Sequence, residues 1–222
     1  MAGAPILVTG ATGFVGSHVV DRLLEAGRTV RVTVRARSNL RWLEGKAIEP
    51  VEADLRDPAR VQKAVEGTAA VLHFGGRIRG RRDQFFADNA VATSCLAEAF
   101  AAQAPANGTG LFLYCSSLAA GGPARDRSRG LHPYVVEDDP PRPVSPYGES
   151  KLEGERRLAA IEGRARIVIF RPPAIYGPRD EAILRFFRLI ERGWLLLPRG
   201  RRARFSILHV SDLADATVRA LE

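Results

Sequence analysis

"ILVTGATGFVGSHVVDRLLEAG", residues 6–27, joins an apolar run to a helical pattern through three glycines. The run at 6–8 shows no alternation with polar residues, which suits a strand buried on both faces of a parallel sheet. From Phe14 onward, apolar residues recur at the spacing of one helical face, and Gly27 is placed to end the helix. The order of strand, glycine turn and helix predicts the first unit of an α/β fold.

The three glycines predict that this turn lies against a bound anion. Gly10 has no Cβ and can take a tight turn, while Gly13 and Gly16 allow backbone to approach a ligand and the sheet closely. Free N–H groups at the start of the helix and the helix dipole favour a phosphate or pyrophosphate. The G-x-x-G-x-x-G spacing differs from the G-x-G-x-x-G form of the dinucleotide fingerprint, so a purely structural turn is the alternative.

Length and composition describe an ordinary globular chain. Its 222 residues, 45% of them hydrophobic, suffice for one large α/β domain or for one domain and part of another. No apolar stretch approaches about 18 residues and no signal peptide precedes the first strand, so we expect a cytoplasmic protein without membrane contact. Cys95 and Cys115 lack metal-ligand spacing. They predict two buried thiols, with neither a disulfide nor a metal site.

The net charge of +8 comes mostly from arginines in two runs, at 77–83 and 198–205. Such a charge is compatible with nucleic-acid binding. Neither run, however, forms part of a recognisable nucleic-acid module. We therefore expect solvated loops or an anionic small-molecule substrate, and no nucleic-acid partner.

Strand and helix patterns alternate along the rest of the chain without repeats or low-complexity linkers. One helical pattern starts at Asp57, with Pro58 in its first turn, and residues 83–103 predict one long amphipathic helix. This alternation predicts a doubly wound, mainly parallel sheet with helices on both faces and a ligand beyond the carboxyl ends of its strands. Further strands are expected at 29–34, 47–53, 69–74, 110–117 and 166–172.

Arg35 follows the second predicted strand, with Arg37, Ser38 and Asn39 close by. In dinucleotide-binding folds an acidic residue at this point suits the ribose of NAD, whereas a basic residue suits the 2′-phosphate of NADP. Charge-assisted hydrogen bonds contribute roughly 1.5 to 3 kcal/mol each, which is enough to set this preference. The sequence therefore predicts NADP. The alternative is that Arg35 is an ordinary surface residue and that the site binds NAD.

Tyr147 and Lys151 stand four residues apart in "SPYGESKLEGE", residues 145–155. On a helix these positions share a face, so the phenol and the ammonium group can lie against one ligand. Lowering the phenol pKa from about 10 by about 3 units requires on the order of 4 kcal/mol. A neighbouring lysine charge can provide much of that. A Y-x-x-x-K spacing is common by itself, but here it follows the glycine turn and a strand that ends in Ser-Ser.

Together these motifs resemble the extended short-chain dehydrogenase/reductase family, also called NAD-dependent epimerase/dehydratases. The resemblance implies a Rossmann fold with catalytic Ser, Tyr and Lys, followed by a small C-terminal lobe that selects the substrate. It extends from residue 6 to residue 216. The matching segments are "TGATGFVG", "ADLRD", "NAVATSCLAEAF", "YCSSLAA", "SPYGESKLEGE", "FRPPAIYGP" and "ILHVSDLADA".

The resemblance also implies roles for individual residues. The glycine turn would hold the pyrophosphate, residues after the second and third strands would contact the adenosine, and Lys151 would bind the nicotinamide ribose. The implied catalytic residues are Ser117, Tyr147, Lys151 and Asn89, with Ser116 as the alternative to Ser117. The implied cofactor contacts are Gly10, Gly13, Phe14, Val15, Gly16, Arg35, Asp54, Leu55, Phe74, Gly75, Tyr147, Lys151, Pro172 and Ile175.

The chain departs from the family pattern at two places. Phe74, Gly75 and Gly76 replace the usual pair of small residues after the fourth strand. Phe205 stands where nucleotide-sugar enzymes often have an arginine, and Arg204 lies one position earlier. The second departure argues against a sugar-nucleotide substrate.

We expect residues 1–175 to form an NAD(P)-binding Rossmann domain and residues 176–222 to begin a substrate lobe. We expect this lobe to be truncated, and an unusually short family member is the alternative. The leading hypothesis is an NADP-linked oxidoreductase that transfers hydride to or from a small-molecule substrate with Tyr147 as acid/base. A nucleotide-sugar epimerase or dehydratase with tightly bound NAD is the first alternative. A non-catalytic NADP-sensing protein is the second. The resemblance further implies a homodimer through helices at 83–103 and 146–162.

Overall fold

A six-stranded parallel sheet forms the centre of the molecule, in the order β3-β2-β1-β4-β5-β6. The computed structural model describes residues 3–103, 110–123, 135–194 and 206–222. All six strands lie where the sequence predicts them, because β-branched and aliphatic runs suit a sheet covered on both faces. The strands are β1 (Ile6–Thr9), β2 (Val30–Val34), β3 (Ile48–Glu52), β4 (Ala70–His73), β5 (Leu111–Cys115) and β6 (Arg166–Phe170).

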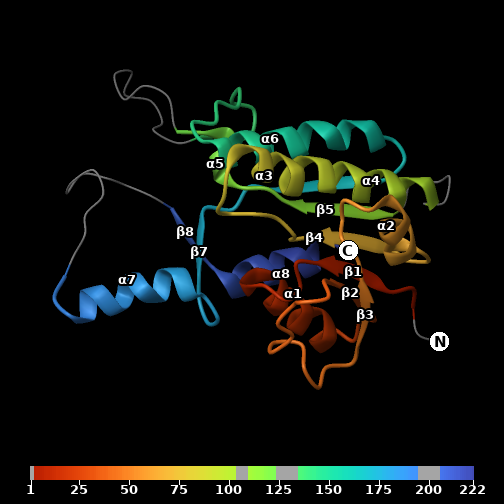
Figure 1. The fold of residues 1–222 in the computed structure, drawn as a ribbon, viewed down its shortest axis with the longest axis horizontal. Coiled ribbons are helices and arrows are strands. Elements are labelled where there is room, and N and C mark those ends of the chain that lie inside the picture. The colour runs from red at the N-terminus through yellow and green to blue at the C-terminus, as the bar shows by residue number, and fades with distance from the viewer. Residues whose placement is uncertain (1–2, 104–109, 124–134, 195–205) are drawn as a thin grey trace.

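Helices cover both faces of this sheet, which confirms the doubly wound fold (Figure 1). One apolar cluster lies between the strands and the helices α1 and α8, and its residues Val19 and Leu23 are fully buried. The other holds Leu96 and Phe100 against Phe112 of β5. The helices on the two faces are α1 (Phe14–Glu25) and α8 (Val210–Arg219), and α2 (Pro58–Val65), α4 (Ala92–Gln103) and α6 (Pro146–Arg157).

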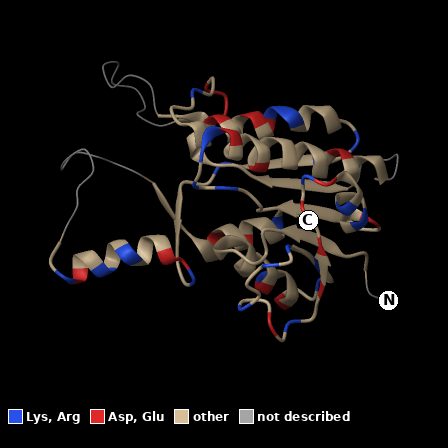
Figure 2. Ribbon diagram, viewed as in Figure 1, with Lys and Arg blue, Asp and Glu red and all other residues tan. Residues whose placement is uncertain are grey.

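The C-terminal part of the chain divides between the sheet and a separate projection. α8 packs on α1, where Arg22 is ion-paired with Asp215, and Ala214 belongs to the apolar cluster on that face. By contrast, α7 (Glu181–Glu191) buries none of its residues and projects from the body in Figure 1. Its charged residues alternate with uncharged ones in Figure 2. The two short parallel strands β7 (Ala174–Tyr176) and β8 (Ile207–His209) lie beside it. The domain boundary after residue 175 stays a prediction.

Two of the three glycines are required by the packing of the turn itself. Gly10 has a φ of 70°, and a Cβ on it would stand 2.7 Å from the backbone nitrogen of Gly75. A Cβ on Gly16 would collide with the carbonyl oxygen of Gly10. Gly27 follows α1 with a φ of 67°, as its predicted role at the helix end requires.

The helix predicted at 83–103 is found, since residues 82–103 are helical throughout, but it is not a regular α-helix. The segment forms α3 (Arg82–Phe86), a π-helix η1 (Ala87–Val91) and then α4. The carbonyl oxygen of Asn89, inside η1, accepts hydrogen bonds from the hydroxyls of Thr93 and Tyr114, at 2.8 and 3.1 Å. Side-chain hydroxyls therefore donate to a backbone carbonyl where the regular i to i−4 hydrogen bonds of the α-helix are interrupted. Such π-helical turns are frequent at functional sites.

Several smaller expectations have clear outcomes. Asp57 caps α2 by accepting hydrogen bonds from the N–H groups of residues 59 and 60, as predicted. Cys95 and Cys115 are free thiols, but both are only partly buried. Among the described residues, no helix is long and apolar enough to cross a membrane, and no group of side chains suits a metal ion. The arginine run at 198–205, with Arg204 and Phe205, lies outside the described residues.

Candidate cofactor and active site

A cavity of about 270 Å³ opens at the carboxyl ends of β1, β2, β3 and β4. Open parallel sheets bind their ligands at this edge, because the strand order reverses there between β1 and β4. The glycine turn forms one wall, and the segments that follow the other strands form the rest. The expected cofactor residues that line the cavity are Gly10, Gly13, Arg35, Asp54, Leu55, Phe74 and Gly75.

Phe14, Val15 and Gly16 form the first turn of α1 immediately after this wall. Gly13 is the N-cap and provides no side-chain cap. The N–H groups of the first turn have no carbonyl partner within the helix, so they are available to an anion in front of it. These three residues thus lie next to the cavity without lining it.

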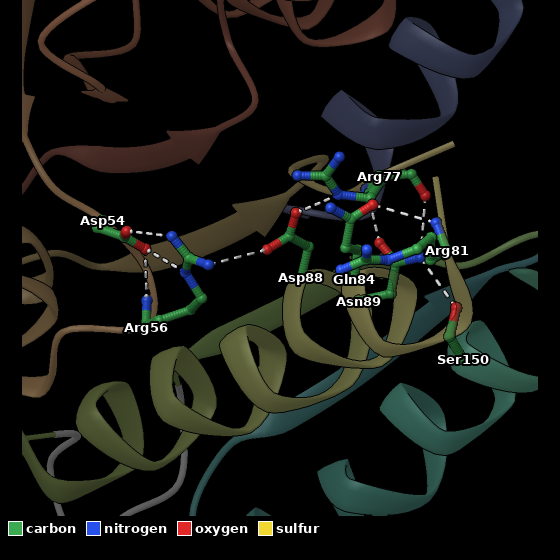
Figure 3. Close-up of polar contacts among 8 residues, drawn as sticks. All are labelled: Asp54, Arg56, Arg77, Arg81, Gln84, Asp88, Asn89 and Ser150. Carbon is green, nitrogen blue, oxygen red and sulfur yellow. Dashed lines mark hydrogen bonds and ion pairs between the residues drawn. The ribbon is translucent and has the colours of Figure 1, made fainter. Parts of the chain in front are cut away.

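Ion pairs line the cavity beyond β3 and β4 (Figure 3). Asp54 accepts hydrogen bonds from Arg56, with Nη2 at 2.6 Å from Oδ2, and this lowers the pKa of the Asp54 carboxyl to about 2. Asp88 lies 2.6 Å from Arg77 Nε and 3.8 Å from Arg56 Nη1. Neither Arg56 nor Asp88 was predicted as a site residue, and Arg77 was predicted only as part of the arginine run at 77–83. The arginines could have been found by their position just after two strands, whereas nothing in the sequence marks Asp88.

Asn89 connects the loop after β4 to α6. Its side chain is buried, and Oδ1 accepts the Arg77 N–H at 2.7 Å while Nδ2 donates to the Arg77 carbonyl at 3.0 Å. Nδ2 also donates to the Ser150 hydroxyl of α6 at 2.9 Å. One amide therefore connects the cavity wall to the helix that carries Tyr147 and Lys151.

The two serines after β5 have different partners. Ser116 is buried and donates to Glu155, which Arg171 also binds at 2.6 Å. Ser117 begins α5 (Leu118–Gly121), accepts the Ala119 N–H at 3.2 Å and lies near enough to the Tyr147 phenol to oppose the rise of its pKa. Ser117 is thus the serine that meets the phenol.

Tyr147 and Lys151 lie on one helix, but their electrostatics differ from the expectation. Ser145 caps α6 with Pro146 in its first turn, which places the two residues one turn apart. Burial lowers the pKa of Lys151 to about 8, and its Nζ lies 4.3 Å from the ring centre of Tyr114. The predicted lowering of the Tyr147 pKa by Lys151 is not found. Burial instead raises that pKa, and the nearby Ser117 opposes this effect.

Pro172 and Ile175 lie outside the cavity lining. Pro172 is buried and its carbonyl accepts the Leu118 N–H at 2.9 Å, so the segment after β6 lies beside the Ser117 turn. Ile175 belongs to β7 and pairs with Leu208 of β8. Both residues belong to the segment that leads from β6 to α7.

The parallel sheet, the glycine turn and the meeting of Ser117 with Tyr147 define a nucleotide-binding α/β protein of the Rossmann type. The chain belongs to the NAD dependent epimerase/dehydratase family, which it matches over residues 6–222.

Relatives in this family carry different activities. The chain is 32% identical to a ceramide reductase of Caulobacter vibrioides over 217 residues, which are 96% of this chain and 59% of that relative. It is 30% identical to a UDP-glucose 4-epimerase of Rhizobium leguminosarum bv. trifolii, with 100% and 73% covered. The crystal structure of the Thermus thermophilus UDP-glucose 4-epimerase in complex with NAD superposes with a TM-score of 0.82 at 25% identity, with 98% and 74% covered. The chain thus spans about three fifths of the reductase.

Proposed function

We propose that the protein is an NADP-linked oxidoreductase, which transfers hydride between a nicotinamide and a hydroxyl-bearing or carbonyl carbon. The observation that carries this proposal is the proximity of Ser117 to the Tyr147 phenol, with buried Lys151 one helical turn away. A tyrosine, a serine and a lysine converge there at the edge where parallel sheets bind ligands. Membership in the family and the ceramide reductase among its relatives support the same reading.

The cavity suits a dinucleotide. Gly10 and Gly13 present no side chains to it, and the first turn of α1 offers unpaired N–H groups to a diphosphate. Arg35 lies on the wall at the end of β2, where a 2′-phosphate would meet a positive charge. The bound dinucleotide would supply or accept the hydride at its nicotinamide ring. Arg35 is our reason for preferring NADP to NAD.

The residues of the chain would manage the proton. Tyr147 donates a proton to the substrate oxygen during reduction, or accepts it during oxidation. Ser117 donates a hydrogen bond to the same oxygen and stabilises the negative charge that develops there. Buried Lys151, one helical turn from Tyr147, would bind the ribose of the nicotinamide nucleotide.

A nucleotide-sugar epimerase or dehydratase is the second candidate. The UDP-glucose 4-epimerases among the relatives and the NAD complex of one of them favour it. The same Ser117, Tyr147 and Lys151 would serve that reaction, in which the hydride returns within one turnover. A non-catalytic NADP-binding protein is the third candidate, and the retention of all three residues argues against it.

The test is the Tyr147→Phe variant. We expect turnover to be abolished while affinity for NADPH changes by no more than about threefold, because the phenol moves the proton but the cavity walls bind the dinucleotide. Turnover would be followed by the absorbance of the reduced nicotinamide, with ketone-bearing lipids and with UDP-glucose as substrates. Undiminished turnover in this variant, with any substrate that the parent converts, would contradict the proposal.

A further inference from the structure

A chain of buried hydrogen bonds runs behind the cavity, through a histidine that the proposed chemistry does not use. His73, the last residue of β4, is fully buried. Its Nδ1 lies 2.6 Å from the hydroxyl of Thr9 in β1, and its Nε2 lies 3.0 Å from the hydroxyl of Thr93 in α4. The imidazole therefore connects the strand before the glycine turn to the helix after η1.

The neighbouring bonds determine which ring nitrogen carries the proton. Thr93 donates its one hydroxyl proton to the Asn89 carbonyl at 2.8 Å, so it can only accept a bond from the ring. His73 Nε2 must therefore be protonated and donate. On the other side, the hydroxyl oxygen of Thr9 accepts the Gly75 N–H at 3.1 Å, and its own proton is free to point to Nδ1. A neutral ring that is protonated at Nε2 gives every donor and acceptor in this series of hydrogen bonds a partner.

The surroundings of the ring favour this neutral form. Burial lowers the pKa of His73 to about 3, and the charge of Lys151 acts in the same direction. The ring of Tyr114 stacks on the imidazole at 5.5 Å between centres. A second proton on the ring would deprive the Thr9 hydroxyl of its acceptor at Nδ1. It would also add a buried positive charge that the charge of Lys151 opposes.

Both ends of this series of hydrogen bonds belong to the candidate site. Gly75 lines the cavity. At the other end, the backbone of Asn89 receives the Thr93 hydroxyl, and the Asn89 side chain holds Arg77 of the cavity wall and Ser150 of α6. The position of His73 thus fixes Gly75 relative to Asn89, and through Asn89 relative to the helix of Tyr147.

We propose that His73 is a positioning residue, whose imidazole is held as the Nε2–H tautomer between Thr9 and Thr93 and keeps the cavity wall in register with the catalytic helix. This inference rests on the proposed function for its effect on cofactor binding. The tautomer itself follows from the hydrogen-bond chain alone.

The tautomer is tested by long-range ¹H–¹⁵N correlation spectra of the ¹⁵N-labelled protein. We expect one neutral Nε2–H form of His73 from about pH 5 to pH 9, because the ring has one donor and one acceptor to face. A pure Nδ1–H form, a mixture of tautomers or a doubly protonated ring in that range would overturn the inference. This measurement needs neither a substrate nor a cofactor.

The positioning role is tested with a matched pair of variants at Thr93. Thr93→Val removes the acceptor of the Nε2–H bond at nearly constant volume, whereas Thr93→Ser keeps the hydroxyl. We expect Thr93→Val to weaken NADPH binding about tenfold and to give mixed tautomers, and Thr93→Ser to bind within about twofold of the parent. Fluorescence titration with NADPH and NADH measures the affinities.

Failure of the inference and failure of the proposed function give different results. A parent protein that binds neither NADPH nor NADH overturns both. Binding by the parent that is equally tight in Thr93→Val and Thr93→Ser overturns only the positioning role. Where Thr93→Val does not fold, the spectra of the parent and of Thr93→Ser decide, because both must show the single Nε2–H form.

Discussion

Ser116 donates its hydroxyl proton to the buried carboxylate of Glu155. Arg171 binds the same carboxylate through two nitrogens. Ser116 is therefore part of the polar contact that joins α6 to the segment after β5. Ser117, the next residue, is left to meet Tyr147. Adjacent serines therefore have separate tasks, one in the core and one at the site.

Ser117→Ala and Ser116→Ala should separate these tasks. We expect Ser117→Ala to lower kcat by about 10² to 10³ with little change in stability, as for other donors to a developing oxyanion. Ser116→Ala should instead lower the free energy of unfolding by about 1 to 3 kcal/mol, because Glu155 loses a buried donor. Steady-state kinetics and urea unfolding measure the two effects. The reverse assignment would make Ser116 the catalytic serine.

Arg35 should set the choice of dinucleotide. We expect the protein to bind NADPH more tightly than NADH by about tenfold or more, since a charge-assisted bond contributes about 1.5 to 3 kcal/mol. Arg35→Asp should narrow or reverse that difference. Arg37→Asp is the matched control, because Arg37 is equally exposed but is not part of the cavity lining, and it should leave the ratio within about threefold. Equal affinities in the parent would make Arg35 a surface charge.

Lys151 should give stability a distinctive dependence on pH. Its pKa is about 8 in the folded protein and 10.5 in the unfolded chain. Between these pH values the Lys151 side chain binds more protons in the unfolded chain than in the folded protein. Its contribution to the free energy of unfolding therefore increases as pH rises from 8 to 10.5. Below pH 8 the cost of the buried charge is fully present. Urea unfolding of the parent and of Lys151→Met would show this rise as a difference between them, and parallel curves would contradict it.

Cofactor retention should distinguish a reductase from an epimerase. A reductase exchanges its dinucleotide in each turnover, whereas an epimerase regenerates NAD in place and benefits from holding it. We expect the protein to purify largely without a dinucleotide and to bind added NADPH reversibly. Absorbance and mass analysis of the denatured supernatant would measure this. Recovery of stoichiometric NAD after extensive dialysis would replace the reductase proposal with the epimerase or dehydratase.

The sheet could be predicted from the sequence because its signals are local. The apolar run at residues 6–8, the glycine turn after it and the Asp57 cap each specify backbone geometry through a few neighbouring residues. The spacing of Tyr147 and Lys151 likewise placed both on one helix. The expected cofactor residues that gather in the cavity all follow strands, which is a rule of the fold.

What the sequence did not predict depends on contacts between distant segments. The π-helix at Ala87–Val91 involves Tyr114 on β5, which no periodicity within the helix can indicate. The pKa of Tyr147 reflects its burial, and burial is set by the packing of α6 on the rest of the chain. Asp88 pairs with arginines from two other loops. These features emerge only when the elements are assembled.

The π-helix at Ala87–Val91 determines how α3 is oriented relative to α4. A π-turn holds one residue more than an α-turn, so deleting a single residue in 87–91 would restore a continuous α-helix and rotate α3 by about 100° relative to α4. Asn89 would then lose its two bonds to the Arg77 backbone. Deleting one residue at 87–91 is therefore expected to separate the cavity wall from α6, because the Asn89 amide joins them.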